Sequence, residues 1–191
     1  MASLTKRLFS PEEYLEMERK ADYRSQYLDG EIFAMAGASE PHNLITVSVA
    51  AVLHSQMKGR SCKVYASDMR VDVRLNGLYT YPDVVAICGE IKLSDEHKDM
   101  LLNPTVIIEV LSESTEAFDR GEKFERYRRI ESLVEYLLVA QDRPHIEHYV
   151  RQASGRWLLS EANGLDNSLH LNSIGCDLSL ADVYEKLDLA R

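Results

Sequence analysis

The chain contains little cysteine, with three residues in 191. Cys62, Cys88 and Cys176 are widely spaced, and no C-x-x-C pair is present. An odd number of cysteines without paired spacing argues against a disulfide framework and against a structural zinc site. We therefore expect all three to be small, buried apolar residues in a protein of a reducing compartment.

Long apolar runs are also missing. No stretch approaches the roughly 20 apolar residues that span a bilayer, and residues 1–10 lack the apolar core of a signal peptide. These absences predict no membrane partner and a cytoplasmic protein. The length of 191 residues suits a single domain, 1–191, that is large enough to bury a full core.

Basic residues are outnumbered, because 22 Lys and Arg face 31 Asp and Glu, which gives a formal net charge of −9. Phosphate binding normally needs a basic surface, so this balance counts against a nucleic-acid partner. Segment 120–129 weakens the objection because it holds five basic residues. Glu122 and Glu125 are interleaved with them, so a solvated helix face is the alternative explanation.

The pattern of apolar residues predicts an α/β protein with a mixed central sheet flanked by helices, its core over about 26–140. Ser10-Pro11-Glu12-Glu13 forms a capping box that starts a helix, and Asp29-Gly30 turns a hairpin within 26–35. The other expected elements are a helix over 41–57, strands over 63–75 and 79–88 joined at Asn76-Gly77, strands over 106–111 and 135–140, a helix within 115–130, an antiparallel pair over 146–150 and 157–160, and a terminal helix over 178–187.

Two carboxylates stand in otherwise apolar strands. Asp83 directly follows Pro82, and Glu109 lies within the apolar run 104–111. An ionised carboxylate in such a strand is costly unless something pairs with it. Proline within a strand suggests an edge or a bulge, which often re-aims a side chain near an active site. A hard cation shared by the two strands would be a suitable partner, with Asp83, Glu109 and the Val110 carbonyl as ligands of Mg²⁺ or Mn²⁺.

The positive charge that would complete this site is not in the strand. Leu111 points to the same face as Glu109 and carries no charge. Lys123 is the nearest candidate, on the following helix, from which its ammonium would orient a water and neutralise the transition state. The alternative explanation is an i,i+4 surface pair with Asp119. Asp119 and Ser114 are the two candidate N-caps of that helix.

The order of these motifs resembles that of a known family. Pro82-Asp83 and Glu109-Val110-Leu111 look like the PD-(D/E)XK pattern of the restriction-endonuclease-like superfamily, with the lysine absent from its usual place. The wider chain resembles the Uma-type putative restriction endonucleases. The matching segments are Asp29-Gly30-Glu31, His42, Ile108-Glu-Val-Leu-Ser112, Ser114-Thr115, Asp119-Arg-Gly-Glu-Lys123, Tyr127 and Glu135-Tyr-Leu-Leu-Val139.

This resemblance implies a restriction-endonuclease-like fold and a Mg²⁺- or Mn²⁺-dependent endonuclease that acts on DNA, working as a homodimer to cut two strands. It implies Asp83 and Glu109 as metal ligands, Lys123 as a migrated catalytic lysine and Glu31 as a further acid of the site. Glu31 is also explained as a solvated strand end, and His42 as an exposed residue near a helix start.

A non-enzymatic alternative stays open. The same fold can be kept as an inactive module that dimerises or associates with DNA, and the displaced lysine and the net charge of −9 favour that alternative. An enzyme that acts on RNA or on a nucleotide is a third possibility, because nothing in the sequence excludes it.

Overall fold

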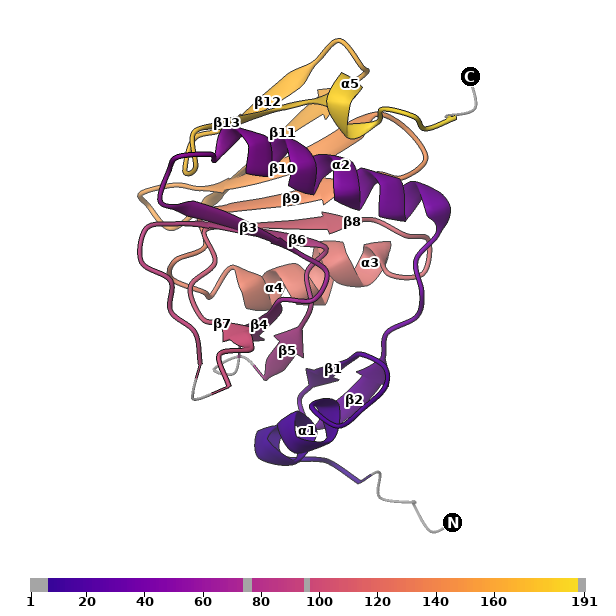
Figure 1. Ribbon diagram of the computed structural model, residues 1–191, viewed down its shortest axis with the longest axis vertical. Coiled ribbons are helices and arrows are strands. Elements are labelled where there is room, and N and C mark those ends of the chain that lie inside the picture. The colour runs from indigo at the N-terminus through magenta and orange to yellow at the C-terminus, as the bar shows by residue number, and fades with distance from the viewer. Residues whose placement is uncertain (1–6, 74–76, 95–96, 189–191) are drawn as a thin grey trace.

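The computed structural model describes residues 7–73, 77–94 and 97–188, and its strands form two main sheets (Figure 1). The larger sheet has the strand order β11-β10-β9-β8-β6-β3, and the smaller has the order β2-β1-β5-β4-β7. The larger sheet consists of β3 (Cys62–Ala66), β6 (Val84–Cys88), β8 (Val106–Val110), β9 (Glu135–Val139), β10 (His145–Arg151) and β11 (Trp157–Asn163). The smaller consists of β1 (Ser25–Leu28), β2 (Glu31–Ala34), β4 (Arg70–Val73), β5 (Leu78–Thr80) and β7 (Met100–Leu101).

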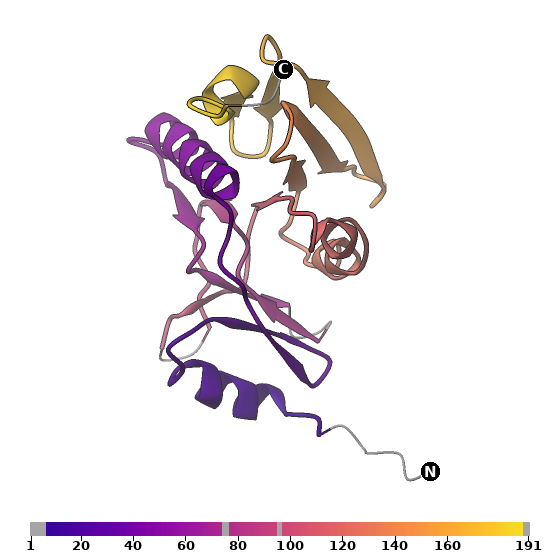
Figure 2. The same cartoon turned by 90° about the vertical axis from the view of Figure 1, so that its right-hand side faces the viewer.

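Helices cover both faces of the larger sheet (Figure 2). One face is covered by α2 (Glu40–Gln56). The other is covered by a continuous helical segment of α3 (Glu116–Phe118), the π-helix η2 (Asp119–Lys123) and α4 (Phe124–Tyr127). None of the helices in the described residues is both long and apolar enough to cross a membrane. The mixed sheet between helical layers confirms the predicted α/β class.

The alternation of side chains along β8 separates two apolar cores. Val106 and Ile108 pack with α2, whereas Ile107 lies in the cluster that contains Leu111 and Tyr127. β8 pairs in parallel with β9 and antiparallel with β6, so it is a central strand with all five residues buried. Glu109 therefore projects from the middle of the sheet toward the α3–α4 layer.

The N-terminal helix and hairpin form as predicted. α1 (Pro11–Glu18) begins with the capping box, in which the Glu13 amide donates to the Ser10 hydroxyl and the Ser10 amide donates to the Glu13 carboxylate. β1 and β2 pair antiparallel around Asp29 and Gly30, both of which have positive φ. In Figure 1 this unit lies at the far end of the molecule from β12 and α5.

The two long strands expected over 63–75 and 79–88 are each broken in two. β3 and β6 belong to the larger sheet, whereas β4 and β5 belong to the smaller one. The first break contains Ser67, whose φ of 51° interrupts the extended backbone. The second contains Pro82, which has no amide hydrogen to donate to a ladder. Of the predicted Asn76-Gly77 turn, Asn76 lies outside the described residues, although β4 and β5 pair antiparallel as a hairpin would.

The expectation for the cysteines is wrong for two of the three. Cys62 and Cys88 form a disulfide, because β3 and β6 pair in a register that places them directly opposite, with their Cα atoms 4.0 Å apart. Their sequence spacing gives no sign of this long-range register. Cys176 is a free, buried cysteine, as expected.

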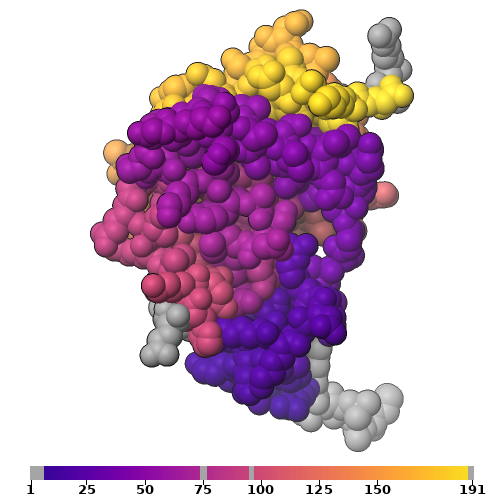
Figure 3. Space-filling view, viewed as in Figure 1, coloured from indigo at the N-terminus to yellow at the C-terminus, as the bar shows by residue number. Residues whose placement is uncertain are grey.

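The C-terminal segment also differs from the prediction. β12 (Ser168–Leu171) and β13 (Cys176–Ser179) form a hairpin, and only a single helical turn follows, α5 (Leu180–Val183). Cys176 and Leu178 are buried with exposed Asp177 between them, which is the alternation of a strand. Leu180 and Val183 of α5 join Leu53 of α2 in one apolar cluster. Figure 3 shows α2 and this C-terminal segment side by side on the surface.

Candidate active site

Glu109 is the centre of a buried polar cluster. The residue is 3% exposed, and its side chain points from β8 toward η2 and α4. Burial raises the pKa of Glu109 to about 8; the positive charge of Lys123 opposes the shift, and the negative charges of Asp119 and Asp83 add to it. Burial and the acidic neighbours therefore destabilise the ionised form of Glu109, even though Lys123 contacts it.

Lys123 reaches Glu109 from the covering helix. Its Nζ lies 2.8 Å from Glu109 Oε1 and 3.1 Å from Asp119 Oδ1. Burial lowers the pKa of Lys123, but Glu109 and Asp119 together raise it above its ordinary value, so the amine stays protonated. The structure therefore brings Glu109 and Lys123 together as the sequence predicted.

Lys123 and Asp119 both face inward from the π-helical turn. Asp119 and Lys123 are the first and last residues of η2, and they are 3% and 6% exposed. The i,i+4 pair considered for the sequence is thus real but buried, not a surface pair. Asp119 is not a cap, because Phe118 before it is already helical. Wide turns of this kind are frequent at functional sites.

Tyr127, one helical turn beyond Lys123, fixes the orientation of the glutamate. Its hydroxyl donates to Glu109 Oε1 at 2.9 Å, and its side chain is fully buried. Tyr136 of β9 donates in turn to the backbone carbonyl of Asp119 at 3.0 Å. These two hydrogen bonds connect the helical segment to β8 and β9 beside Glu109.

Asp83 lies where the chain passes between the two sheets, just before β6. Its Oδ2 accepts a hydrogen bond of 2.8 Å from the backbone amide of Val110, the residue after Glu109. This contact brings the two predicted carboxylates to the same end of β8. The contact uses the Val110 amide, so the predicted ligation through the Val110 carbonyl stays a prediction.

His42 belongs to the site, contrary to the expectation of an exposed residue. Its Nε2 lies 3.2 Å from Asp83 Oδ2, and its side chain is 14% exposed. Burial lowers the pKa of His42, but Asp83, with Glu109 and Asp119 further away, raises it overall. The sequence signal was the position of His42 within the family pattern. Its place near the start of α2 gave no indication of the contact with Asp83.

Glu31 lies apart from the contacts described so far. It opens β2, the edge strand of the smaller sheet, opposite Leu28. The preceding turn approaches the helical layer, because Asp29 Oδ2 lies 2.6 Å from Arg126 Nη2 of α4. The role of Glu31 in the site stays a prediction.

The charges of the cluster suit a divalent cation. Asp83, Glu109 and Asp119 are three acidic groups around one ammonium, so negative charge is in excess once Glu109 is ionised, above its raised pKa of about 8, with His42 neutral. Within the described residues, no group of three or more His, Cys, Asp or Glu side chains is arranged to hold a metal ion. Mg²⁺ is commonly held by only one or two protein carboxylates, with waters and substrate phosphates as its other ligands. Asp83 and Glu109 fit that description.

The chain is similar to known proteins in sequence. The family model described as "Putative restriction endonuclease", Uma2, matches residues 11–182. Two uncharacterized proteins of Synechocystis sp. (strain ATCC 27184 / PCC 6803 / Kazusa) are similar: sll1609, 38% identical over 86% of this chain and 93% of its own, and slr1290, 34% identical over 93% and 92%.

A crystal structure shares the fold. It is that of a putative nuclease of DUF820 from Anabaena variabilis ATCC 29413, which aligns over 91% of this chain and 96% of its own with a TM-score of 0.74 and 18% identity. The similarity of the two folds agrees with the predicted mixed α/β fold. With a model match over residues 11–182 and two relatives above 30% identity, this chain belongs to the Uma2 family of putative restriction endonucleases.

Proposed function

We propose that this protein is a Mg²⁺- or Mn²⁺-dependent endonuclease that hydrolyses phosphodiester bonds in DNA. One observation carries the proposal: the Lys123 ammonium on the helix lies 2.8 Å from the buried Glu109 carboxylate, at the end of β8 where the Val110 amide donates to Asp83. Structural ion pairs seldom gather two further acids around a buried carboxylate, because each adds to its cost.

Asp83 and Glu109 would hold the cation, with the Val110 carbonyl as a further ligand. When bound, the cation supplies Lewis-acid chemistry, since it lowers the pKa of a water and neutralises charge on the phosphodiester. Tyr127 keeps Glu109 Oε1 oriented through its hydroxyl. The ammonium of Lys123 holds its proton beside Glu109 and offers fixed positive charge where charge develops on the phosphate.

Asp119 and Glu31 have supporting roles in this proposal. Asp119 shares Lys123 with Glu109 and so limits the directions in which the ammonium can point. Glu31 is the further acid, carried by the hairpin whose turn is tied to α4 through Asp29 and Arg126. A homodimer would present two such sites to the two strands of DNA.

The test is nicking of supercoiled plasmid by purified protein with Mg²⁺ or Mn²⁺. Asp83→Ala, Glu109→Gln and Lys123→Ala should each lower the rate by about 10²-fold or more, the scale of one lost electrostatic catalyst. Asp177→Asn is the matched control, because Asp177 is an exposed carboxylate on β13 that pairs only with exposed His170 among the contacts described. Nicking that survives in Asp83→Ala would locate the activity elsewhere or in a contaminant.

The second candidate function is a module of the same fold without catalysis. The observation in its favour is that Glu109 is already engaged by Lys123 and Tyr127. Calorimetry separates the two candidates. An enzyme should bind Mn²⁺ saturably and lose that binding in Asp83→Ala, whereas a module should show no saturable Mn²⁺ binding in either protein.

A further inference from the structure

Tyr81 is a buried side chain two residues before Asp83, in the segment that joins the two sheets. Its hydroxyl accepts hydrogen bonds from Arg70 Nε at 3.0 Å and Arg70 Nη2 at 2.6 Å, and donates one of 2.8 Å to Glu18 Oε1. Tyr81 is 7% exposed and Arg70 is 4% exposed. The phenol is therefore fixed from both sides in a place that excludes water.

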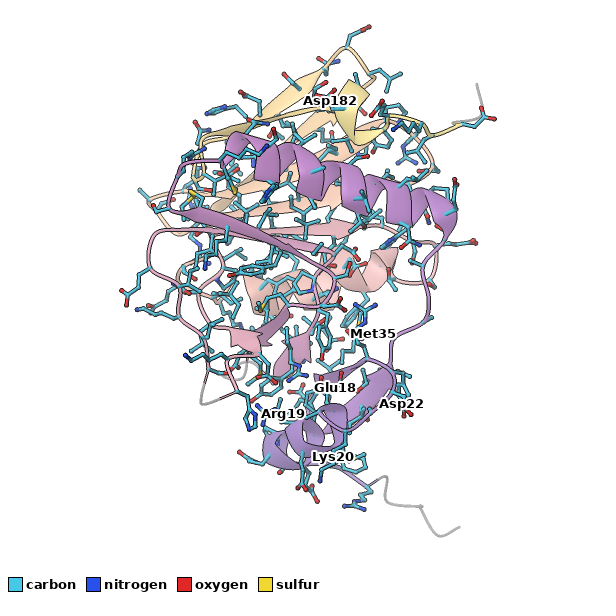
Figure 4. All side chains as sticks on the ribbon, in the orientation of Figure 1. Glu18, Arg19, Lys20, Asp22, Met35 and Asp182 are labelled. Atoms are coloured by element: carbon cyan, nitrogen blue, oxygen red, sulfur yellow. A yellow bond between two sulfur atoms is a disulfide. The ribbon has the colours of Figure 1, made fainter. Side chains whose placement is uncertain are left out.

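Glu18 brings the N-terminal helix into this network. It comes from the last turn of α1 and is 8% exposed, and its carboxylate also accepts the backbone amide of Ser25 at 3.0 Å. Arg19 beside it lies 3.0 Å from Asp99, which Arg70 also approaches at 3.4 Å. Figure 4 shows Glu18 and Arg19 at the end of α1 that faces the rest of the molecule.

The backbone of Asp83 is tied to the same part of the chain. Its carbonyl accepts a hydrogen bond of 2.9 Å from the amide of Ser67. Arg24, just before β1, donates to the Ser67 carbonyl and forms an ion pair of 3.1 Å with Asp68. Pro82 cannot donate a hydrogen bond, so side chains and neighbouring loops must hold this segment in place of a strand ladder.

We propose that Tyr81 is a positioning residue for Asp83, and that α1, through Glu18, thereby sets the direction of the Asp83 carboxylate. This inference rests on the proposed function only for the statement that Asp83 binds a metal. The positioning itself concerns the hydrogen bond between Asp83 and Val110, which can be measured in the metal-free protein.

Amide hydrogen exchange followed by NMR provides that measurement. The Val110 amide donates to the Asp83 carboxylate, whereas the Leu111 amide next to it donates to the Val139 carbonyl at 2.8 Å. In Tyr81→Phe the Val110 amide should exchange faster by roughly fivefold, the factor given by losing the stabilisation of one hydrogen bond. Leu111 is the internal reference and should keep its rate. An unchanged Val110 rate, or an equal acceleration of both amides, would overturn the proposal.

A matched variant separates positioning from general loss of stability. Tyr14→Phe removes another buried hydroxyl of the same N-terminal unit, which donates to the Ser25 carbonyl at 2.7 Å and, in the described part of the chain, forms no hydrogen bond with Tyr81 or Asp83. It should leave the Val110 rate as in the wild type. Glu18→Gln weakens the acceptor of the Tyr81 hydroxyl while the tyrosine itself is kept. It should also accelerate exchange of the Val110 amide, and it provides a second test if Tyr81→Phe folds poorly. Acceleration in Tyr14→Phe equal to that in Tyr81→Phe would contradict a specific role.

Calorimetry with Mn²⁺ then links positioning to the metal. Tyr81→Phe should weaken Mn²⁺ binding by about the same factor as it accelerates Val110 exchange, and Tyr14→Phe should not. If the wild type binds no Mn²⁺, the proposed function fails, while the exchange rates still decide whether Tyr81 positions Asp83. If Mn²⁺ binds equally well to the wild type and to Tyr81→Phe, the positioning proposal fails while the metal site stands.

Discussion

Two buried glutamates on neighbouring strands have opposite electrostatic surroundings. Glu109 of β8 is 3% exposed and Glu135 of β9 is fully buried. Glu135 accepts hydrogen bonds from His148 Nε2 at 2.5 Å and from the Ser173 amide at 2.7 Å. Burial raises the pKa of Glu135, but these partners lower it below its ordinary value overall. The pKa of Glu109 is instead raised to about 8.

The difference shows that burial alone does not identify a functional carboxylate. Within the described residues, the hydrogen-bond partners of Glu135 are the His148 ring and the Ser173 amide, so its charge is satisfied and it joins the β12–β13 turn to the larger sheet. Glu109 has Asp83 and Asp119 nearby in addition to Lys123, so its charge is in excess. A carboxylate whose surroundings disfavour its ionised form is a candidate functional residue, because a bound cation would stabilise that form.

The largest expected effect is on stability at Glu135. Glu135→Ala leaves the His148 ring and the Ser173 amide without their buried acceptor, which should lower the free energy of unfolding by about 3 kcal/mol. Urea titration followed by circular dichroism measures this. The control is Asp177→Ala, which removes an ion pair of the same type with His170 that is more than half exposed, and should change stability by less than about 0.5 kcal/mol. Similar losses in both variants would mean that Glu135 is not a structural anchor.

A smaller effect of opposite sign is expected at Glu109. In the metal-free protein at pH 8, Glu109→Gln should increase the free energy of unfolding, on the order of 1 kcal/mol, because a neutral amide relieves the repulsion from Asp83 and Asp119. The same variant should lose the stabilisation that Mn²⁺ gives the wild type. Thermal unfolding with and without Mn²⁺ measures both. If metal-free Glu109→Gln is instead less stable than the wild type, the Glu109 carboxylate stabilises the fold, as we expect for Glu135.

The most diagnostic effect is on the pH dependence of stability. The folded pKa of Glu109 is about 8, above its ordinary value of 4.5, so its contribution to stability is complete below pH 4.5 and is lost as pH rises through 8. The folded pKa of Glu135 is below 4.5, so its contribution is present above pH 4.5 and is lost as pH falls through the folded value. Glu109→Gln should therefore flatten the alkaline side of the stability profile, and Glu135→Gln the acidic side. Urea midpoints from pH 3 to pH 9 test this, and profiles that change on the same side would contradict the comparison.

Local signals predicted local structure well. The capping box at Ser10, the turn at Asp29-Gly30 and the pairing of β10 with β11 depend on residues close together in the sequence, and all three form. The pairing of Lys123 with Glu109 was also predictable, because a helix that follows a buried strand must pack back over it.

Features that depend on distant segments were not predictable in the same way. The partner of Cys62 is set by the register of β3 against β6, and the contact of His42 with Asp83 is set by where α2 crosses the sheet. Asp119 was a candidate N-cap, but the helix has already begun before it, and its side chain points inward to Lys123. In each case the residue could be identified from the sequence, whereas tertiary packing decided its partner.

The wide turn of η2 makes the length of this segment part of the site. Successive residues of an ordinary helix are rotated by about 100° around its axis. In η2, Asp119 and Lys123 are both buried and in contact. Removal of one residue within this turn would leave an ordinary helical turn and change the spacing between the two side chains. When sequences of this family are aligned, a one-residue gap between the positions of Asp119 and Lys123 should therefore mark a member in which no acid shares the lysine with the glutamate.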